Sequence, residues 1–155
     1  MERRAFLASG PGAATLVLAA ASGLSTAHAQ NAPGWNKAAF EAKTLTDAAK
    51  AMGSTGAPTE SRDLILQAPE IAENGSVVRV SVQSNLPNTT LIAFVVEKNP
   101  SALAAMFEIP PGTDAGVTTN VKMAQTSNVY ALVKAGDKYF YAAKEVKVTL
   151  GGCGG

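Results

Sequence analysis

The stretch of sequence that most restricts the fold is Val78-Arg79-Val80-Ser81-Val82-Gln83, in which apolar and polar side chains alternate. Successive side chains of a β-strand point to opposite faces of the sheet, so we expect the valines on a buried face and the polar residues in solvent. A strong tight-turn signal, Asn74-Gly75, stands shortly before this stretch. The pattern therefore predicts a strand that borders a hydrophobic core on one side only.

Strand-length segments continue on both sides of this stretch. One of them, Leu91 to Val96, is an apolar run that we expect to be buried on both faces or to lie under a partner. Gly136-Asp137 predicts a hairpin turn. The other expected strands are Asp63 to Leu66, Met106 to Ile109, Val117 to Met123, Val129 to Lys134, Tyr139 to Tyr141 and Val146 to Leu150. Short strands roughly every eight to twelve residues predict a mostly β fold, an Ig-like antiparallel β-sandwich, and the absence of a Cys…Trp…Cys spacing excludes the disulfide-pinned antibody type.

One helix is expected before the strands, from about residue 36 to residue 52. Asn36 is a suitable N-cap, and Gly53 is suited to end the helix. We expect the helix to pack against a sheet as a lid; the alternative is that Trp35 and Phe40 contact a partner. The apolar residues that define it recur every three to four positions: Trp35, Ala39, Ala42, Leu45, Ala49 and Met52.

The first residues of the sequence predict export. Arg3-Arg4 is a twin-arginine pair, an apolar stretch from Ala13 to Leu24 follows, and Ala27-His28-Ala29 is a small-x-small cleavage site. Spanning a membrane takes about 20 predominantly apolar residues, which disfavours a transmembrane anchor here. We therefore expect a Tat-type signal peptide that is cleaved on export to the periplasm.

The expected organisation has four parts. Residues 1–29 form the signal peptide, residues 30–60 the helix and a linker, residues 61–150 the β-sandwich, and residues 151–155 a flexible glycine-rich arm. The linker is the Gly/Pro/Thr-containing segment from Ser54 to Glu60. Cleavage leaves 155 − 29 = 126 residues, the size of one domain.

The residues that remain after cleavage exclude several classes of function. The one histidine, His28, leaves with the signal, so a chain with one cysteine has no means to build a Ser-His-Asp or Cys-His site, a common zinc site or a C-x-x-C redox pair. Loss of Glu2, Arg3 and Arg4 leaves 13 − 2 = 11 basic and 12 − 1 = 11 acidic side chains, a balance that argues against nucleic acid and anionic membranes as partners. We therefore predict no catalytic residue, no metal site and no cofactor, and a carrier rather than an enzyme.

The one cysteine lies in the segment Gly151-Gly152-Cys153-Gly154-Gly155. Glycine loses more conformational freedom on ordering than any other residue and chain ends fray, so this segment is predicted to be a flexible arm. At ~3.3–3.6 Å per extended residue, the steps from Leu150 to Cys153 give a reach of roughly 10 Å. A thiol on so narrow an arm predicts the presentation of a sulfur atom to a recessed site.

A strand that ends in Val146-Lys147-Val148-Thr149 and is followed by this glycine-rich segment resembles the SoxY family, the sulfur carriers of the periplasmic thiosulfate-oxidising Sox system. Two further stretches are similar to the family: Pro69 to Gly75, and Lys98-Asn99-Pro100 after an apolar strand. The sequence departs from the family at Asn120, where an arginine is usual. The resemblance implies that Cys153 is the covalent attachment site, with the arm formed by Gly151, Gly152, Gly154 and Gly155.

The resemblance also implies a cycle of chemistry and a set of partners. A c-type cytochrome joins thiosulfate oxidatively to the cysteine, a manganese-dependent hydrolase removes the terminal sulfonate as sulfate, and a sulfane dehydrogenase oxidises the remaining persulfide. The family works as a heterodimer with SoxZ, another small β-sandwich. We expect the apolar run Leu91 to Val96 to contribute an exposed patch to that interface.

Two other classes of function remain open from the residues themselves. One is a non-catalytic Ig-like module of the cell envelope that dimerises through Cys153. The other is a thiol oxidoreductase, which the missing second cysteine and the missing histidine disfavour.

Overall fold

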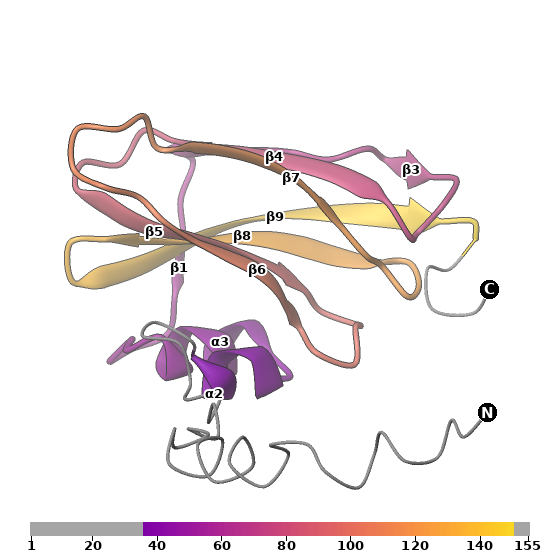
Figure 1. Cartoon of the computed structure of the whole chain (residues 1–155), viewed down its shortest axis with the longest axis horizontal. Coiled ribbons are helices and arrows are strands. Elements are labelled where there is room, and N and C mark those ends of the chain that lie inside the picture. Colours follow the sequence, from indigo (N-terminus) through magenta and orange to yellow (C-terminus); the bar gives the residue numbers. More distant parts are fainter. Residues whose placement is uncertain (1–35, 151–155) are drawn as a thin grey trace, which may run out of the picture. The chain divides into compact units, whose positions relative to one another are not determined.

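Two β-sheets packed face to face form the body of the computed structural model, which describes residues 36–150 (Figure 1). The larger sheet has the strand order β1-β9-β8-β5-β6, with β3 also paired to β9, and the smaller has the order β2-β4-β7. The strands are β1 Thr59–Glu60, β2 Leu64–Gln67, β3 Ile71–Ala72, β4 Val78–Ser84, β5 Thr89–Val96, β6 Leu103–Glu108, β7 Gly116–Val121, β8 Ser127–Ala135 and β9 Lys138–Val148. The expected mostly β sandwich is confirmed.

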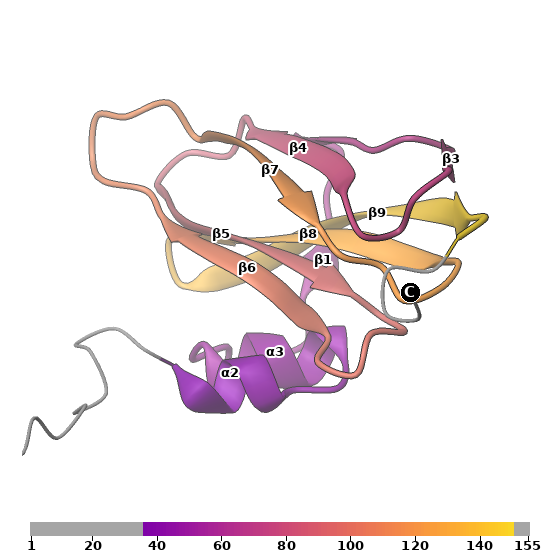
Figure 2. The same cartoon turned by 45° about the vertical axis from the view of Figure 1, so that its right-hand side comes forward.

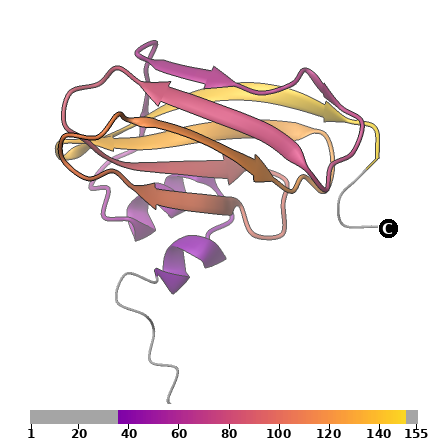
Figure 3. The ribbon, with the colours of Figure 1, turned by 45° about the horizontal axis from the view of Figure 1, so that its top comes forward.

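The alternation in β4 builds the inner face of the smaller sheet, as predicted. Val78, Val80 and Val82 are each at most 3% exposed, whereas Arg79 between them is exposed. Across the core, the larger sheet contributes fully buried side chains of β5 such as Phe94. Figure 3 shows the smaller sheet lying over the larger one. Burial of each Val or Phe side chain stabilises the fold by about 1.5–3 kcal/mol.

The β8–β9 hairpin also forms as predicted. Ala135 pairs with Lys138 across a two-residue turn, and Gly136 has the positive φ of +59° that this turn requires. The two strands expected at residues 139–141 and 146–150 are instead one continuous strand, β9. They are continuous because β8 pairs with β9 from Lys138 to Val146 and so satisfies the backbone of the residues between them.

The single helix expected over residues 36–52 is wrong, because the segment forms two short helices, α2 Lys37–Glu41 and α3 Leu45–Ala51. Ala42 leaves the helical region at φ −59° and ψ 142°, and its carbonyl accepts a hydrogen bond from the N–H of Ala102 at 3.1 Å. Thr44 then caps α3, since its side chain accepts from the N–H of Asp47. Contact with the β5–β6 loop and a local cap thus break the helix.

Both expected ends of this helical segment are confirmed. The side chain of Asn36 accepts a hydrogen bond from the N–H of Ala39 at 3.0 Å. Gly53 has a φ of +95° after the C-cap residue Met52, the left-handed conformation usual after a helix. Neither helix of the described residues 36–150 is long and apolar enough to cross a membrane.

The two helices form a lid, residues 36–52, over the outer face of the larger sheet (Figure 2). Ala39, Ala48 and Ala49 are fully buried in one apolar cluster with Ala93 and Val95 of β5. The apolar run of β5 is therefore buried on both faces, which was one of the two expected arrangements. The expected exposed patch on this strand is wrong, because the helices of the same chain cover it.

Two short parallel strands were not predicted. Thr59 of β1 pairs with Phe140, and Ile71 of β3 pairs with Lys147, each in parallel orientation along β9. The sandwich is thus not wholly antiparallel, and the last two residues of the expected linker, Thr59–Glu60, belong to a sheet. Strands of two residues are too short to show a period of two, so no sequence pattern reveals them.

Candidate functional site

The predicted site residues of the arm, Cys153 with Gly151, Gly152, Gly154 and Gly155, lie outside the described residues, as do Arg3 and Arg4 of the predicted signal and Trp35. The structure describes the segment to which the arm is attached. We call residues 147–150, at the end of β9, the arm root. Its surroundings decide where the arm begins.

Strand β3 holds one side of the arm root. The N–H of Lys147 donates to the carbonyl of Glu70 at 2.9 Å, and the N–H of Thr149 donates to the carbonyl of Ala72 at 3.1 Å. These bonds extend the parallel pairing of β3 with β9 to the last described residues. The backbone of the arm root is therefore paired rather than left as an open edge.

The turn after β3 completes this contact. The N–H of Gly75 donates to the carbonyl of Leu150 at 2.7 Å, and the hydroxyl of Thr149 donates to the carbonyl of Glu73 at 3.1 Å. Asn74 shapes the turn, because its side chain accepts from the N–H of Ser76 at 2.8 Å. The predicted turn at Asn74-Gly75 is confirmed, and it holds the arm root.

A side chain supports the opposite side of the arm root. Strand β8 begins at Ser127, opposite Val146, and supplies no backbone partner for Val148. The hydroxyl of Thr126 takes this place and accepts from the N–H of Val148 at 2.9 Å. Pairing on both sides therefore continues beyond the end of the β8–β9 ladder.

The loop between β7 and β8 connects the arm root to a second stretch singled out in the sequence. The side-chain amide of Asn99 donates to the carbonyl of Lys122 at 2.7 Å and accepts from the N–H of Ala124 at 3.0 Å. Between these residues, the N–H of Met123 donates to the carbonyl of Gly75 at 2.7 Å. The stretches 69–75 and 98–100 thus meet around the arm root, a convergence that sequence reasoning did not predict.

Exposed apolar side chains accompany these segments. Among the described residues, four large apolar side chains are exposed, and three of them are Ile71, Val77 and Leu150, at 60%, 61% and 64%. The fourth, Ile65, lies on β2. Ile71 and Leu150 belong to the segments that are hydrogen-bonded to each other at the arm root, and Val77 follows the turn. This end of the sandwich therefore offers apolar contact area.

Titratable groups with a shifted pKa lie elsewhere. Burial raises the pKa of Tyr139 above 10.0, and burial together with the charge of Glu97 raises the pKa of Tyr130. Both side chains belong to the apolar cluster under the lid, and both stay protonated at neutral pH. Within residues 36–150, no three His, Cys, Asp or Glu side chains gather in a way that would hold a metal ion.

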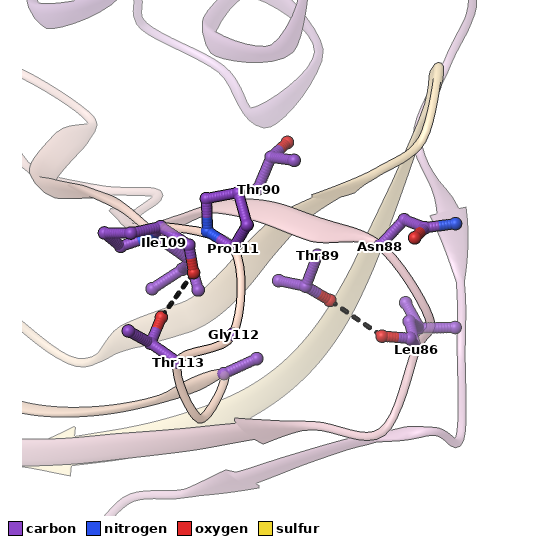
Figure 4. Close-up of a pocket in the computed structure, with 10 residues that line it drawn as sticks. Leu86, Asn88, Thr89, Thr90, Ile109, Pro111, Gly112 and Thr113 are labelled. Carbon is purple, nitrogen blue, oxygen red and sulfur yellow. Dashed lines mark hydrogen bonds between the residues drawn. The ribbon is translucent and has the colours of Figure 1, made fainter.

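One hollow lies at the other end of the sandwich, between the β4–β5 and β6–β7 loops (Figure 4). It has a volume of about 330 Å³, and none of the residues that line it is titratable. The hydroxyls of Thr89 and Thr113 donate to the carbonyls of Leu86 and Pro110 and so close their own loops. Nothing in this hollow suits the chemistry of a sulfur carrier, so the arm root is the candidate site.

Residues 48–153 match the family model described as "Sulfur oxidation protein SoxY". Among solved structures, the sulfur carrier protein SoxY from Chlorobium limicola f thiosulfatophilum is 38% identical, with a TM-score of 0.63 over 71% of this chain and 96% of that one. A lytic polysaccharide monooxygenase from Jonesia denitrificans is 16% identical over 70% of this chain and 75% of its own, and its TM-score of 0.39 is too low to support any argument. No curated protein matches the chain.

Proposed function

The chain belongs to the SoxY family and is a non-catalytic sulfur carrier protein of the Sox system, and from this premise we propose that it holds thiosulfate-derived sulfur covalently on Cys153. The observation that carries the proposal is the hydrogen-bonded arm root, which ends two residues before the Gly152-Cys153 pair. A paired strand that passes directly into glycines supplies a fixed base for a narrow arm. The matched family segment also extends to Cys153.

The sequence of the arm suits entry into several enzymes. Gly151, Gly152, Gly154 and Gly155 carry no Cβ, so the arm presents only backbone on either side of the sulfur atom. Its reach from Leu150 is roughly 10 Å. The sandwich therefore stays outside a partner while the sulfur atom enters it.

The proposed cycle begins with oxidative loading. The sulfur atom of Cys153 loses its proton and forms a sulfur–sulfur bond with thiosulfate, and the two electrons released would pass one at a time to a c-type cytochrome. A manganese-dependent hydrolase then adds water to the terminal sulfonate, which leaves as sulfate, and a persulfide remains on Cys153. A sulfane dehydrogenase takes electrons from the outer sulfur while water supplies oxygen, and a second hydrolysis releases sulfate and restores the thiol.

Partner recognition is part of the proposal. The family serves the periplasmic Sox system, and we propose that residues 1–29 direct this chain there by the twin-arginine route. We further propose a heterodimer with a SoxZ-like β-sandwich. Strand β6 supports this idea: it is an edge strand of the larger sheet, and Leu103 to Phe107 carry no charge and no proline that would block strand pairing. The exposed Ile71, Val77 and Leu150 are suited to transient contact with the enzymes that receive the arm.

Intact-mass spectrometry of the protein from thiosulfate-oxidising cells tests the attachment site. We expect adducts of the masses of a thiosulfonate and a persulfide, which a strong thiol reductant removes, and none on the Cys153→Ser variant. The variant should melt at the wild-type temperature, because the substitution lies beyond the paired strand. Adducts that persist on Cys153→Ser, or an unmodified wild-type protein in actively oxidising cells, would contradict the proposal.

A further inference from the structure

We propose that Asn99 and Thr149 are positioning residues that fix the point from which the carrier arm extends, an inference that rests on the proposed role of Cys153. They belong to a connected set of hydrogen bonds, which we call the arm-root bracket: Asn99, Met123, Gly75, Thr149 and Leu150, with their backbone partners. The bracket joins three loops and β9 at one end of the sandwich. It contains residues of the two stretches that resemble the family, 69–75 and 98–100. The proposed chemistry on Cys153 gives these stretches no other role.

The inner part of the bracket ties the arm root to the core. Met123 is fully buried, and its N–H donates to the carbonyl of Gly75. The N–H of the same glycine donates to the carbonyl of Leu150, and both bonds are 2.7 Å long. Gly75 is itself buried, so it has little room to shift. Through Gly75, the position of Leu150 is thereby fixed to the backbone of Met123, whose side chain belongs to the buried core.

The outer part of the bracket is made by side chains. Half-buried Asn99 bridges Lys122 and Ala124 with both ends of its amide, and so holds the loop that presents the N–H of Met123. Exposed Thr149 is on the arm root itself, and its hydroxyl donates to the carbonyl of Glu73. Neither side chain belongs to the buried apolar core. Their removal therefore loosens the bracket and leaves the core packing in place.

The bracket determines the length of the free arm. With the bracket closed, three residue steps separate Leu150 from Cys153; with it open, the last residue held by a bond outside the bracket is Val148, whose N–H donates to Thr126, and the steps become five. At ~3.3–3.6 Å per residue the reach rises from roughly 10 Å to roughly 17 Å. The effective concentration of a tethered group falls with about the −3/2 power of the tether length, so it drops roughly twofold.

The test is the kinetics of oxidative loading of the mature protein by the purified cytochrome partner. The double variant Asn99→Ala/Thr149→Val should lower kcat roughly twofold, because arm insertion follows docking. The KM of the cytochrome for the carrier protein should stay within error of the wild-type value, because the exposed docking surface is unchanged. A matched double variant, Asn120→Ala/Thr118→Val, alters the same residue types at exposed positions of β7 and should behave as wild type.

Two further measurements separate positioning from general damage. The ¹⁵N heteronuclear NOE of the Thr149 and Leu150 amides should fall in the double variant, whereas alkylation of Cys153 by iodoacetamide should proceed at the wild-type rate. Thr149→Ser keeps the hydroxyl and should therefore retain the kcat and the ordered amides that Thr149→Val loses. If the double variant folds poorly, the single exposed change Thr149→Val, compared with Thr149→Ser, carries the test alone.

A lowered NOE of the Thr149 and Leu150 amides together with a wild-type kcat would overturn the inference. An unchanged NOE of these amides in the double variant would overturn it too. A raised KM with an unchanged kcat would also overturn it, because that result assigns the bracket to docking. Failure of the proposed function has a different signature: Cys153→Ser would still take up sulfur, whatever the bracket variants do. The two outcomes are therefore distinguishable in one set of experiments.

Discussion

Thr126 and Asn99 illustrate how single polar side chains take over where a strand ladder ends. The hydroxyl of Thr126 accepts from the N–H of Val148, a donor that β8 does not reach. The amide of Asn99 completes the backbone bonding of the next loop in the same way. Backbone donors that leave water must find a partner, and here short polar side chains supply it. The attachment point of the arm depends on these residues.

At this scale we predict that Thr126→Val destabilises the protein by about 1 kcal/mol. The valine has nearly the same shape but lacks the oxygen that accepts from Val148, so a half-buried N–H loses its partner. Urea denaturation of the mature protein measures the change. Thr118→Val, at an exposed position of β7, is the control and should shift the midpoint little. Equal midpoints for Thr126→Val and the control would show that water replaces the hydroxyl without cost.

The two helices of the lid depend on contacts with the larger sheet for their stability. Helices of five and seven residues are too short to be stable alone in water. Fully buried alanines let them approach β5 and β8 closely, and the hydroxyl of Tyr139 on β9 donates to the carbonyl of Met52 at the end of α3. The lid therefore covers the apolar outer face of β5.

We predict that Tyr139→Phe lowers stability by about 1 kcal/mol at neutral pH, because Met52 loses its hydrogen bond. The difference from wild type should shrink as the pH rises above about 10. Burial raises the pKa of Tyr139 in the folded state above the ordinary 10.0, so above that pH the unfolded chain binds fewer protons and wild-type stability falls through the folded pKa. The other tyrosines are common to both proteins and cancel. Urea midpoints at neutral and alkaline pH measure this, and a difference that grows with pH would contradict it.

At the scale of the whole molecule, the two ends of the sandwich differ in the segments and side chains that they present. The arm root, β3 and the two family-like stretches occupy one end, and the uncharged hollow between the β4–β5 and β6–β7 loops occupies the other (Figure 1). Three of the four exposed large apolar side chains of the described residues belong to segments at the arm-root end. Contact with successive enzymes is thus expected at the end that carries the arm.

The proposed export route leads to a prediction for the whole chain. Twin-arginine export carries folded cargo, so a SoxZ-like partner without its own signal would travel with this chain. Replacement of Arg3 and Arg4 by lysine should leave both proteins in the cytoplasm and abolish thiosulfate-dependent respiration. Fractionation and immunoblotting measure this, with Lys37→Arg as a control outside the signal. A partner that still reaches the periplasm would contradict co-export, and a precursor that is processed normally would contradict the twin-arginine route.

Features that depend on neighbouring residues were predictable from sequence alone. The alternation of residues 78–83, the Gly136-Asp137 turn and the cap at Asn36 all formed as expected, because strand period, positive φ and helix capping are local properties. The family was predictable for a similar reason, since its motifs are short and contiguous. The assignment of Cys153 as the attachment site stays a prediction, outside the described residues.

Features that depend on residues distant in sequence were decided only by the tertiary structure. The break between α2 and α3 follows from a bond between Ala42 and Ala102, and the burial of the outer face of β5 follows from the lid. The bracket joins Asn99, Gly75 and Leu150, which stand far apart in the chain. A backbone C=O is the same group in every residue, and so is the N–H in every residue except proline. Sequence therefore carries no record of which distant partner such a group meets; packing of the two sheets makes that choice.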